Sequence, residues 1–482
     1  MFWFGIDFGT TNSACIGIED KRRVKKFSDD EYPFPSLVII DRMTGRVYCG
    51  REAWRRREEL RESCEVIPSI KTYLGTDKTW KIAGRIWTPE MVAAQVFLGL
   101  KERVKKRLGT DELKEAVIAV PVGFSPAARA ALRKAARMAG IEVKSFVSEP
   151  TAALFYHYNE IGHNTRIGVF DWGGGTLDVS VIENRNGCIK ELATGGINKA
   201  GDYIDRLMAE WIHRRIVRKS GQKISFDDMP AEARDKMLTA CEQAKRDLTW
   251  DDTAQIQILD YGPLGDVFET IDIEQFTLLI NPVIDDAISC FGECLERSGM
   301  NIAQLDCILM VGGSVNLRPF NERIAEFWEG KEYYPEGEPE WSVAGGAARL
   351  SINEGKHILT QTVGVVMSDG SLYPLFAKGH YINSGDFSTA TFALVEDAPA
   401  ANLVFADGTG NALGYLSVPA FGFFGEKIEV IAWIDEDLIL RIKARSLNRS
   451  EKSVREWQYD SLRMEYELPV MHLEVDEDDY KI

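Results

Sequence analysis

The chain alternates short apolar runs with longer segments that carry apolar residues at helical spacing. β-branched and apolar residues fill 116–120, 167–170 and 307–311, which is typical of buried strands. Segments 126–139 and 231–248 place alanine and leucine at helical spacing among Lys, Arg and Glu. Strands that alternate with helices predict an α/β domain over about the first 355 residues.

A different pattern begins near residue 362. Segments 388–395, 427–434 and 438–444 alternate apolar and polar residues, and Gly, Asp and Asn turns separate them. Period-two alternation indicates strands with one buried face. We therefore expect a small antiparallel β domain after the α/β domain.

These patterns divide the chain into four parts. We expect an α/β domain at 1–355, a linker at 356–363, a β domain at 364–469 and an acidic tail at 470–482. The tail has little apolar content, so it should be solvated. No C-terminal helical bundle is expected.

Composition limits the classes of partner. At 482 residues the chain exceeds the size at which one core usually stops growing, and 45% hydrophobic with 27% charged residues is typical of globular proteins. A net charge of −17 disfavours binding to nucleic acid or anionic lipid. Without an apolar run long enough to span a bilayer, or a signal peptide, we expect a cytoplasmic protein that does not contact membranes.

The eight cysteines are scattered. Only Cys290 and Cys294 lie close together, one helical turn apart, with no paired histidines nearby. Buried reduced thiols are the expected state, and a metal site is the alternative.

Two segments repeat one plan, a strand, a tight polar turn and a second strand. The first, 4–18, carries a carboxylate, a glycine and polar side chains at its turn: Asp7, Gly9, Thr10, Thr11 and Asn12. The second, 168–182, carries the same types at Asp171, Gly173, Gly174, Gly175 and Thr176. This duplication is the strongest internal signal in the chain.

Such turns suit phosphate. Glycine lets the backbone approach an anion so that successive N–H groups point at phosphate oxygens, and threonine hydroxyls add donors. A carboxylate beside a polyphosphate makes electrostatic sense when Mg²⁺, held through water, lies between them, which implicates Asp7 and Asp171. One such turn alone could be an ordinary hairpin, but two copies favour a phosphate site.

A third element follows a buried strand. Segment 308–311 is apolar and leads into Gly312, Gly313 and Ser314, after which 316–327 is expected to form a helix. A glycine turn of this kind lets a nucleoside lie against the backbone.

These motifs resemble the ATPase domain of the seventy-kilodalton heat-shock chaperones, within the actin and sugar-kinase superfamily. The resemblance covers nearly all of 1–355 and is most specific at 116–121, Arg129, 139–140 and 148–153. It implies a two-lobed, actin-like (ribonuclease H-like) ATPase domain with ATP or ADP and Mg²⁺ as cofactors. The β domain is more weakly similar to the family's peptide-binding β-sandwich, most clearly at 427–440.

The resemblance also implies roles for particular residues. Asp171 and Thr176 would act at the phosphates, while Lys71 and Glu149 would position the attacking water; for Lys71 the alternative is a solvated surface lysine. Asp7 and Asp171 would hold Mg²⁺ through water. Other nucleotide contacts are implied at Gly9, Thr10, Thr11, Asn12, Gly173, Gly174, Gly175, Gly201, Asp202, Glu242, Lys245, Arg246, Thr249, Gly312, Gly313, Ser314, Asn316 and Glu340.

Two further residues match the family's allosteric switch, and three features depart from its pattern. Pro121 and Arg129 would relay nucleotide state, although Arg129 could equally be one of several cations on its helix. The family usually places an arginine where this chain has Asn316, and Arg318 is a candidate substitute. The acidic, leucine-rich linker is replaced by 355–361, and the helical lid is missing.

Three functions follow as hypotheses. The first is a chaperone-like ATPase of low intrinsic turnover whose nucleotide state controls binding of a polypeptide client, with a J-domain co-chaperone and a nucleotide exchange factor as possible partners. The second is an ATP-regulated scaffold with negligible turnover. The third is a small-molecule kinase of the same superfamily, which would need a general base beside an acceptor hydroxyl.

Overall fold

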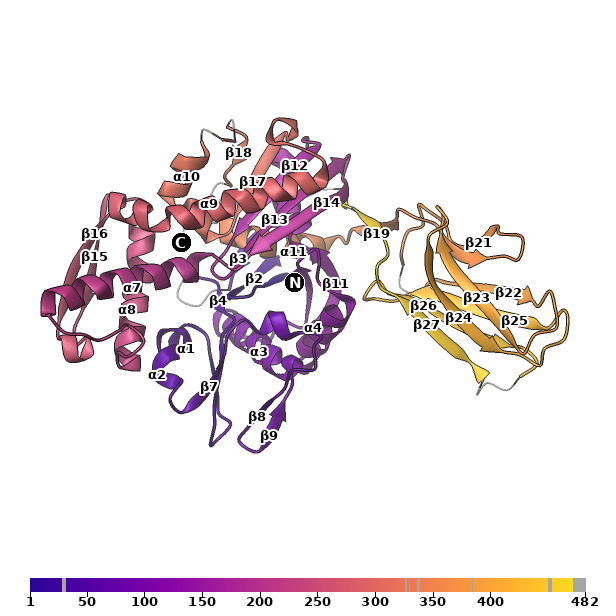
Figure 1. Cartoon of the computed structure of the whole chain (residues 1–482), viewed down its shortest axis with the longest axis horizontal. Coiled ribbons are helices and arrows are strands. Elements are labelled where there is room, and N and C mark those ends of the chain that lie inside the picture. Colours follow the sequence, from indigo (N-terminus) through magenta and orange to yellow (C-terminus); the bar gives the residue numbers. More distant parts are fainter. Residues whose placement is uncertain are drawn as a thin grey trace. The chain divides into compact units, whose positions relative to one another are not determined.

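The computed structural model describes residues 1–27, 32–325, 327–328, 330–335, 339–383, 385–449 and 453–470. These residues form two compact units (Figure 1). The first unit comprises Met1–Asn186 and Glu191–Asn353, and the second comprises Gly187–Lys190 and Glu354–Val470. Of the predicted acidic tail at 470–482, only Val470 lies among the described residues, so the solvation of the tail stays a prediction.

The first unit begins with a mixed sheet. Its strands are β1 (Phe2–Phe8), β2 (Asn12–Glu19), β3 (Arg23–Lys26), β4 (Phe34–Pro35), β10 (Glu115–Val120) and β11 (Glu142–Ser148). β1 and β2 form an antiparallel hairpin, as the sequence predicts. β10 runs parallel to β1, and β11 parallel to β10.

A second sheet repeats this arrangement. Its strands in the first unit are β12 (Arg166–Trp172), β13 (Leu177–Arg185), β14 (Cys188–Ile197), β17 (Cys307–Val311) and β18 (Glu332–Tyr333). β12 and β13 form the second predicted hairpin, and β17 runs parallel to β12 as β10 does to β1. The duplication in the sequence is therefore a duplication of a hairpin with a parallel neighbour.

Helices cover these sheets (Figure 1). Their bounds are α1 (Arg51–Arg55), α2 (Arg57–Leu60), α3 (Pro89–Leu108), α4 (Pro126–Met138), α5 (Glu149–Tyr156), α6 (Tyr158–Ile161), α7 (Gly201–Ser220), α8 (Ala231–Asp247), α9 (Ile273–Ser298), α10 (Arg318–Ile324) and α11 (Ser342–Ile352). The predicted helices at 126–139 and 231–248 are confirmed as α4 and α8. α4 ends before Gly140, whose φ of +73° suits a glycine.

Short strands and 3-10 turns complete the first unit. The strands are β5 (Val38–Asp41), β6 (Val47–Cys49), β7 (Cys64–Ile67), β8 (Trp80–Ile82), β9 (Arg85–Trp87), β15 (Thr253–Ile258) and β16 (Val267–Asp272). The 3-10 turns are η1 (Ile70–Tyr73), η2 (Gly262–Leu264), η3 (Ile302–Gln304), η4 (Gly313–Asn316) and η5 (Pro339–Trp341).

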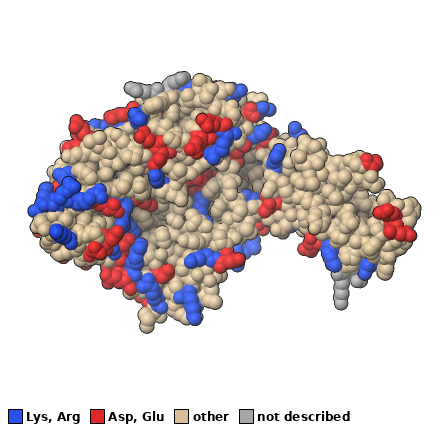
Figure 2. Space-filling view, viewed as in Figure 1, with Lys and Arg blue, Asp and Glu red and all other residues tan. Residues whose placement is uncertain are grey.

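On the face that Figure 2 shows, acidic and basic side chains are interspersed.

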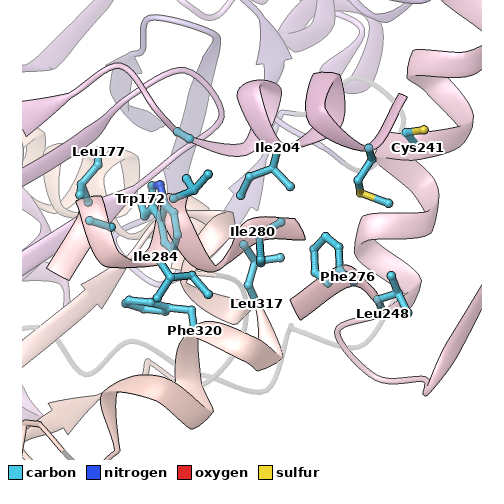
Figure 3. Close-up of a cluster of buried hydrophobic side chains, with 14 of the residues drawn as sticks. Trp172, Leu177, Ile204, Cys241, Leu248, Phe276, Ile280, Ile284, Leu317 and Phe320 are labelled. Atoms are coloured by element: carbon cyan, nitrogen blue, oxygen red, sulfur yellow. The ribbon is translucent and has the colours of Figure 1, made fainter. Parts of the chain in front are cut away.

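Apolar side chains from the β12 sheet and its helices form one continuous core. Figure 3 shows Trp172 of β12, Phe320 of α10 and Ile284 of α9 packed together. The rings of Trp172 and Phe320 meet edge to face with centroids 4.9 Å apart. Phe276 and Leu248 extend this core toward α8. The core therefore fixes α8, α9 and α10 against the strands that end at the β12–β13 turn.

The second unit is almost entirely β structure. Its strands are β19 (Lys356–Leu359), β20 (Val363–Val366), β21 (Leu372–Phe376), β22 (Phe387–Ala393), β23 (Ala400–Asp407), β24 (Ala412–Pro419), β25 (Lys427–Ile434), β26 (Leu440–Ser446), β27 (Arg455–Tyr459) and β28 (Met464–Glu467). Two four-stranded sheets, ordered β21-β20-β23-β24 and β22-β25-β26-β27, share one apolar core. The segment 356–359 of the predicted linker forms β19, which pairs with β28.

Three expected elements differ from the structure. The helix expected at 316–327 does not begin at Asn316, which closes the 3-10 turn η4; α10 begins at Arg318 and ends at Ile324. The strand expected at 438–444 begins at Leu440, because Leu438 has a φ of +63° in a turn. The strand expected at 388–395 ends at Ala393, as β22. These errors lie at element ends, where local turn geometry overrides periodicity.

None of the eight cysteines, all of which the structure describes, forms a disulfide; six are buried, and Cys49 and Cys188 are half-buried. Cys290 and Cys294 both lie on α9. Among the described residues, no helix is long and apolar enough to cross a membrane.

A buried histidine predicts a specific pH dependence of stability. His157 follows α5, its Nε2 lies 2.9 Å from Oγ of Ser342, and burial together with the charge of Arg349 lowers its pKa to about 4. The unfolded chain takes up a proton near pH 6.5 that the folded chain does not, so stability falls as pH drops from 6.5 toward 4, by up to ~3 kcal/mol.

We expect His157→Gln to flatten this part of the profile. Urea unfolding of both proteins between pH 7 and pH 4.5 measures the difference, and other titrating groups cancel in the comparison. Equal pH dependence in the two proteins would show that His157 does not remain neutral in the fold.

Candidate functional site

The turns of the two hairpins meet. A Cβ at Gly175 would lie 2.2 Å from Oγ1 of Thr11, so only a glycine permits this approach. Thr11 donates a hydrogen bond from Oγ1 to Asp202 at 2.9 Å. In the first turn, a Cβ at Gly9 would lie 1.9 Å from the carbonyl oxygen of Asn12. Both turns thus need glycine for steric reasons, and together they line one cavity.

The cavity has a volume of about 380 Å³ and is hollowed between the β1 and β12 sheets. All the residues predicted as catalytic, nucleotide-binding or metal-holding line it, from both turns, α8, the Gly312 turn and Glu340. The sequence analysis missed several others: Tyr32, Arg51, Trp54, Asp178, Asp205 and Trp250. Of these only Asp178, an acid inside the apolar strand β13, carried a signal in the sequence.

The N-terminus of α7 is tied to the second turn. The backbone N–H of Asp202 donates to the carbonyl of Gly174 at 2.8 Å, and the N–H of Gly201 donates to Gly173 at 3.2 Å. Lys245 of α8 donates from Nζ to the carbonyl of Gly201 at 3.0 Å. A change in the position of this turn must therefore move α7 and α8 as well.

A buried ion pair lies on the floor of the cavity. Nζ of Lys71 is 2.6 Å from Oε1 of Glu149, and both residues are buried. Lys71 is placed by η1, which follows Ser69 in a left-handed conformation with φ +55°. Such a φ is uncommon outside glycine, so the surrounding structure must stabilise the local strain.

Three more carboxylates surround this pair. Burial and the charges of Glu149 and Asp178 raise the pKa of Asp7 to about 7, although Lys71 opposes the shift. Burial, followed by Asp7 and Glu149, raises the pKa of Asp171 well above its usual value. Burial lowers the pKa of Lys71, but the charges of Glu149 and Asp7 raise it more. The cluster places four carboxyl groups around one ammonium group, and their mutual repulsion contributes to the raised pKa values.

This cluster of carboxyl groups fits a divalent cation. Magnesium binds carboxylates and phosphate oxygens and usually keeps several waters. Among the described residues, no three His, Cys, Asp or Glu side chains are placed to coordinate a metal directly. Asp7 and Asp171 are the two residues of this cluster that could hold such an ion through water.

Cross-cavity contacts surround Glu242 of α8. Its carboxylate accepts hydrogen bonds from Arg51 at 2.8 Å and from Nε1 of Trp54 at 3.2 Å, and it pairs with Arg246 at 3.0 Å. The guanidinium of Arg246 lies over the ring of Tyr32, 3.8 Å from its centroid. These contacts join the segment before α3 to α8 across one side of the cavity.

Comparison with known families decides the affiliation. A family model described as Hsp70 protein matches residues 76–369, more than half of the chain. The chain belongs to the Hsp70 family. Members of this family are ATP-binding, chaperone-type proteins and ATPases that use ATP or ADP with Mg²⁺ and typically bind polypeptide clients and co-chaperones. The matched range includes Glu149 and the second hairpin turn, while the first turn precedes it.

The position of Asn316 departs from the family's usual pattern. Asn316 lines the cavity where the family usually has an arginine, although Arg51 and Arg246 also line it. Arg318 does not line it; it pairs with Asp252 at 2.9 Å and with Glu322 at 3.3 Å. Arg318 is therefore engaged elsewhere.

Pro121 and Arg129 do not line the nucleotide cavity. Pro121 lines a neighbouring cavity together with Glu149. Arg129 donates from Nη1 to the carbonyl of Phe124 at 2.8 Å. The structure thus places Pro121 beside the floor residue Glu149, and the signalling role of both residues stays a prediction.

The contacts of Glu242 lead to a prediction about the rate of nucleotide dissociation. Burial alone would raise the pKa of Glu242, but Arg51, Lys245 and Arg246 lower it to about 2, so it is charged at neutral pH. Glu242→Gln removes the charge that holds Arg51 and Arg246, and we expect nucleotide to dissociate about tenfold faster, equivalent to ~1.4 kcal/mol.

Stopped-flow displacement of a fluorescent ADP analogue measures the rate of nucleotide dissociation. Glu232→Gln, a substitution on the same helix at an exposed position, is the matched control. An unchanged rate for the Glu242 variant would mean that these contacts do not retain the nucleotide.

Proposed function

We propose that the chain binds ATP with Mg²⁺ in the cavity of the first unit, hydrolyses it slowly and uses nucleotide state to control binding of a polypeptide client. The observation that carries the proposal is the meeting of the two glycine-threonine turns above the Lys71–Glu149 pair. In this account residues 1–355 are a two-lobed, actin-like nucleotide-binding domain. Residues 364–469 form a β-sandwich that binds the client, after a linker at 356–363.

Each residue on the cavity floor would have a separate role in ATP hydrolysis. Phosphoryl transfer depends mainly on positioning and on stabilising charge in the transition state. Lys71 offsets negative charge at the terminal phosphate, and Glu149, held by Lys71 at 2.6 Å, orients the attacking water. Thr176, whose hydroxyl donates to Asp178 at 2.7 Å, offers its Oγ1 at the same turn.

The remaining residues would bind and orient the nucleotide. Thr10, Thr11 and the glycine N–H groups of both turns suit the phosphates, and Arg246 suits the face of the base. Mg²⁺, when bound, would neutralise charge on the phosphates and contact Asp7 and Asp171 through water. The raised pKa values of these two carboxylates support that placement, because a nearby cation would stabilise their charged forms.

An exposed aromatic loop supports client binding by the second unit. Between β24 and β25, Phe421, Phe423 and Phe424 are 65%, 46% and 73% exposed. Fully buried Glu426 accepts hydrogen bonds from the N–H groups of Phe421 at 3.0 Å and of Gly422 at 2.8 Å, so the loop is held in place. A preformed apolar surface of this kind suits an apolar peptide segment.

Asn316 favours one other candidate function. With Asn316 in place of an arginine and Arg318 paired elsewhere, the base is held less tightly, which suits a scaffold that senses ATP with negligible turnover. The two functions differ in phosphate release.

Phosphate release from the purified chain with ATP and Mg²⁺ tests the proposal. We expect slow release that rises when an unfolded polypeptide is added. Nucleotide binding without release would support the scaffold, and ADP formation that requires an added sugar would support a kinase.

A further inference from the structure

A second cavity adjoins the nucleotide cavity in the first unit. It has a volume of about 310 Å³, enough for several water molecules or one phosphate ion. One wall follows the end of β10, and the opposite wall belongs to β13 and β14. The residues that line only this cavity are small or apolar: Pro121, Val122, Gly123, Pro150, Val169, Val179, Ser180, Thr194, Gly195 and Gly196.

Three carboxylates line both cavities. Glu149, Asp171 and Asp178 each contribute to the floor of the nucleotide cavity and to the wall of the second one. Asp171 and Asp178 are paired residues of β12 and β13. Each of these residues borders both cavities, so the two cavities adjoin one another at this wall.

Side-chain contacts cross part of the nucleotide cavity. The contacts of Glu242 with Arg51 and Trp54, and of Arg246 with Tyr32, bridge it. After cleavage, ADP lies between the floor and these contacts. A phosphate ion at the floor that leaves before ADP therefore needs another way out.

We propose that the second cavity is the exit route for the inorganic phosphate that ATP hydrolysis releases. The inference rests on the proposed function. Hydrolysis turns ATP and water into ADP, inorganic phosphate and a proton at neutral pH, and the route carries the phosphate product without making or breaking a bond. Rotation of the Glu149 side chain away from Lys71 joins the two cavities.

Charge differs between the shared wall and the second cavity. The three carboxylates oppose the passage of a phosphate ion through the shared wall, and they also repel an ion that has passed it, so the ion does not return. The guanidinium of Arg297 lies against Gly195 of the second cavity, since a Cβ on that glycine would come within 2.4 Å of Nη2. A cation is thus available beside the cavity wall for a leaving anion.

Two exposed positions allow the route to be blocked. A Cβ built on Gly123 meets no atom within 4 Å, and Gly123 does not have a positive φ, so a large side chain fits without backbone strain. Thr194 of β14 is an exposed residue of the opposite wall. Gly123→Trp and Thr194→Trp each place a bulky ring at the cavity without changing a residue of the nucleotide site.

Single-turnover kinetics of the full chain test the route. Acid quench follows ATP cleavage, a fluorescent phosphate-binding protein follows free phosphate, and a fluorescent analogue follows ADP release. In both variants we expect cleavage within about twofold of the unmodified rate and phosphate release slowed about tenfold, or ~1.4 kcal/mol of barrier. Gly292→Trp, at an exposed glycine of α9 that also has open space, should leave all three rates unchanged.

Two results would overturn the inference in distinguishable ways. If both tryptophan variants cleave ATP and release phosphate as fast as the unmodified chain, the route is wrong while the proposed function stands. If the unmodified chain cleaves no ATP in the quench assay, the proposed function fails and the exit route fails with it.

Discussion

Replacing Lys71 with alanine should slow ATP hydrolysis at least about tenfold, a barrier increase of ~1.4 kcal/mol or more, while ATP still binds. Nζ of Lys71 lies 2.6 Å from Oε1 of Glu149, and the negative charges of Asp7 and Asp178 also raise the pKa of Lys71. Its removal leaves buried carboxylates without this cation. Nucleotide contacts from the two turns and α8 remain, so the loss should appear in turnover rather than in affinity.

The loss of Lys71 also affects stability, and this must be separated from catalysis. Breaking a buried ion pair typically costs ~3–5 kcal/mol because one charge is left uncompensated. The double variant Lys71→Ala with Glu149→Gln removes both charges, so we expect it to regain stability but not turnover. Lys106→Ala, at an exposed position of α3, is the control. Unchanged single-turnover rates in Lys71→Ala would remove Lys71 from the mechanism.

Replacing Gly346 with alanine should destabilise the first unit strongly. A Cβ at this position of α11 would lie 1.8 Å from the carbonyl oxygen of Ala152 in α5, and backbone cannot move aside as a side chain can. α11 packs equally closely on β1, where a Cβ at Gly5 would lie 2.0 Å from the backbone nitrogen of Ala348. Overpacking of this kind costs ~1–3 kcal/mol or more.

Gly292→Ala is the matched control for this effect. Gly292 is also a helical glycine, but its Cβ would meet open space, so alanine should stabilise α9 by up to ~1 kcal/mol. Urea unfolding of the two variants should therefore shift in opposite directions. A Gly346→Ala protein with an unchanged midpoint would show that α11 and α5 are not packed so closely.

Periodicity and turn chemistry agree in several elements, which could therefore be predicted. These elements are the two hairpins, α4, α8 and the strands β10, β12, β17 and β25. That the candidate site residues line one cavity could be predicted for a related reason. Its residues belong to short motifs whose glycines and threonines are needed locally, as at Gly9, Thr11 and Gly175. Local requirements of this kind are visible in a sequence.

Other parts could not be predicted because they depend on long-range packing. Arg51 and Trp54 reach the cavity because α1 lies beside α8, and Tyr32 reaches it beneath Arg246 of α8. These three residues carry no motif. The pairing of Arg318 with Asp252 joins residues far apart in sequence. Likewise, β19 forms within the expected linker because β28 supplies a partner strand.

Calorimetric titration of the full chain with ATP and with ADP in the presence of Mg²⁺ tests the central claim most directly. We expect saturable heat with one nucleotide per chain, and its loss in Gly175→Val, whose side chain would displace Thr11 from the meeting point of the two turns. No heat of binding from the folded, unmodified chain with either nucleotide would contradict the account.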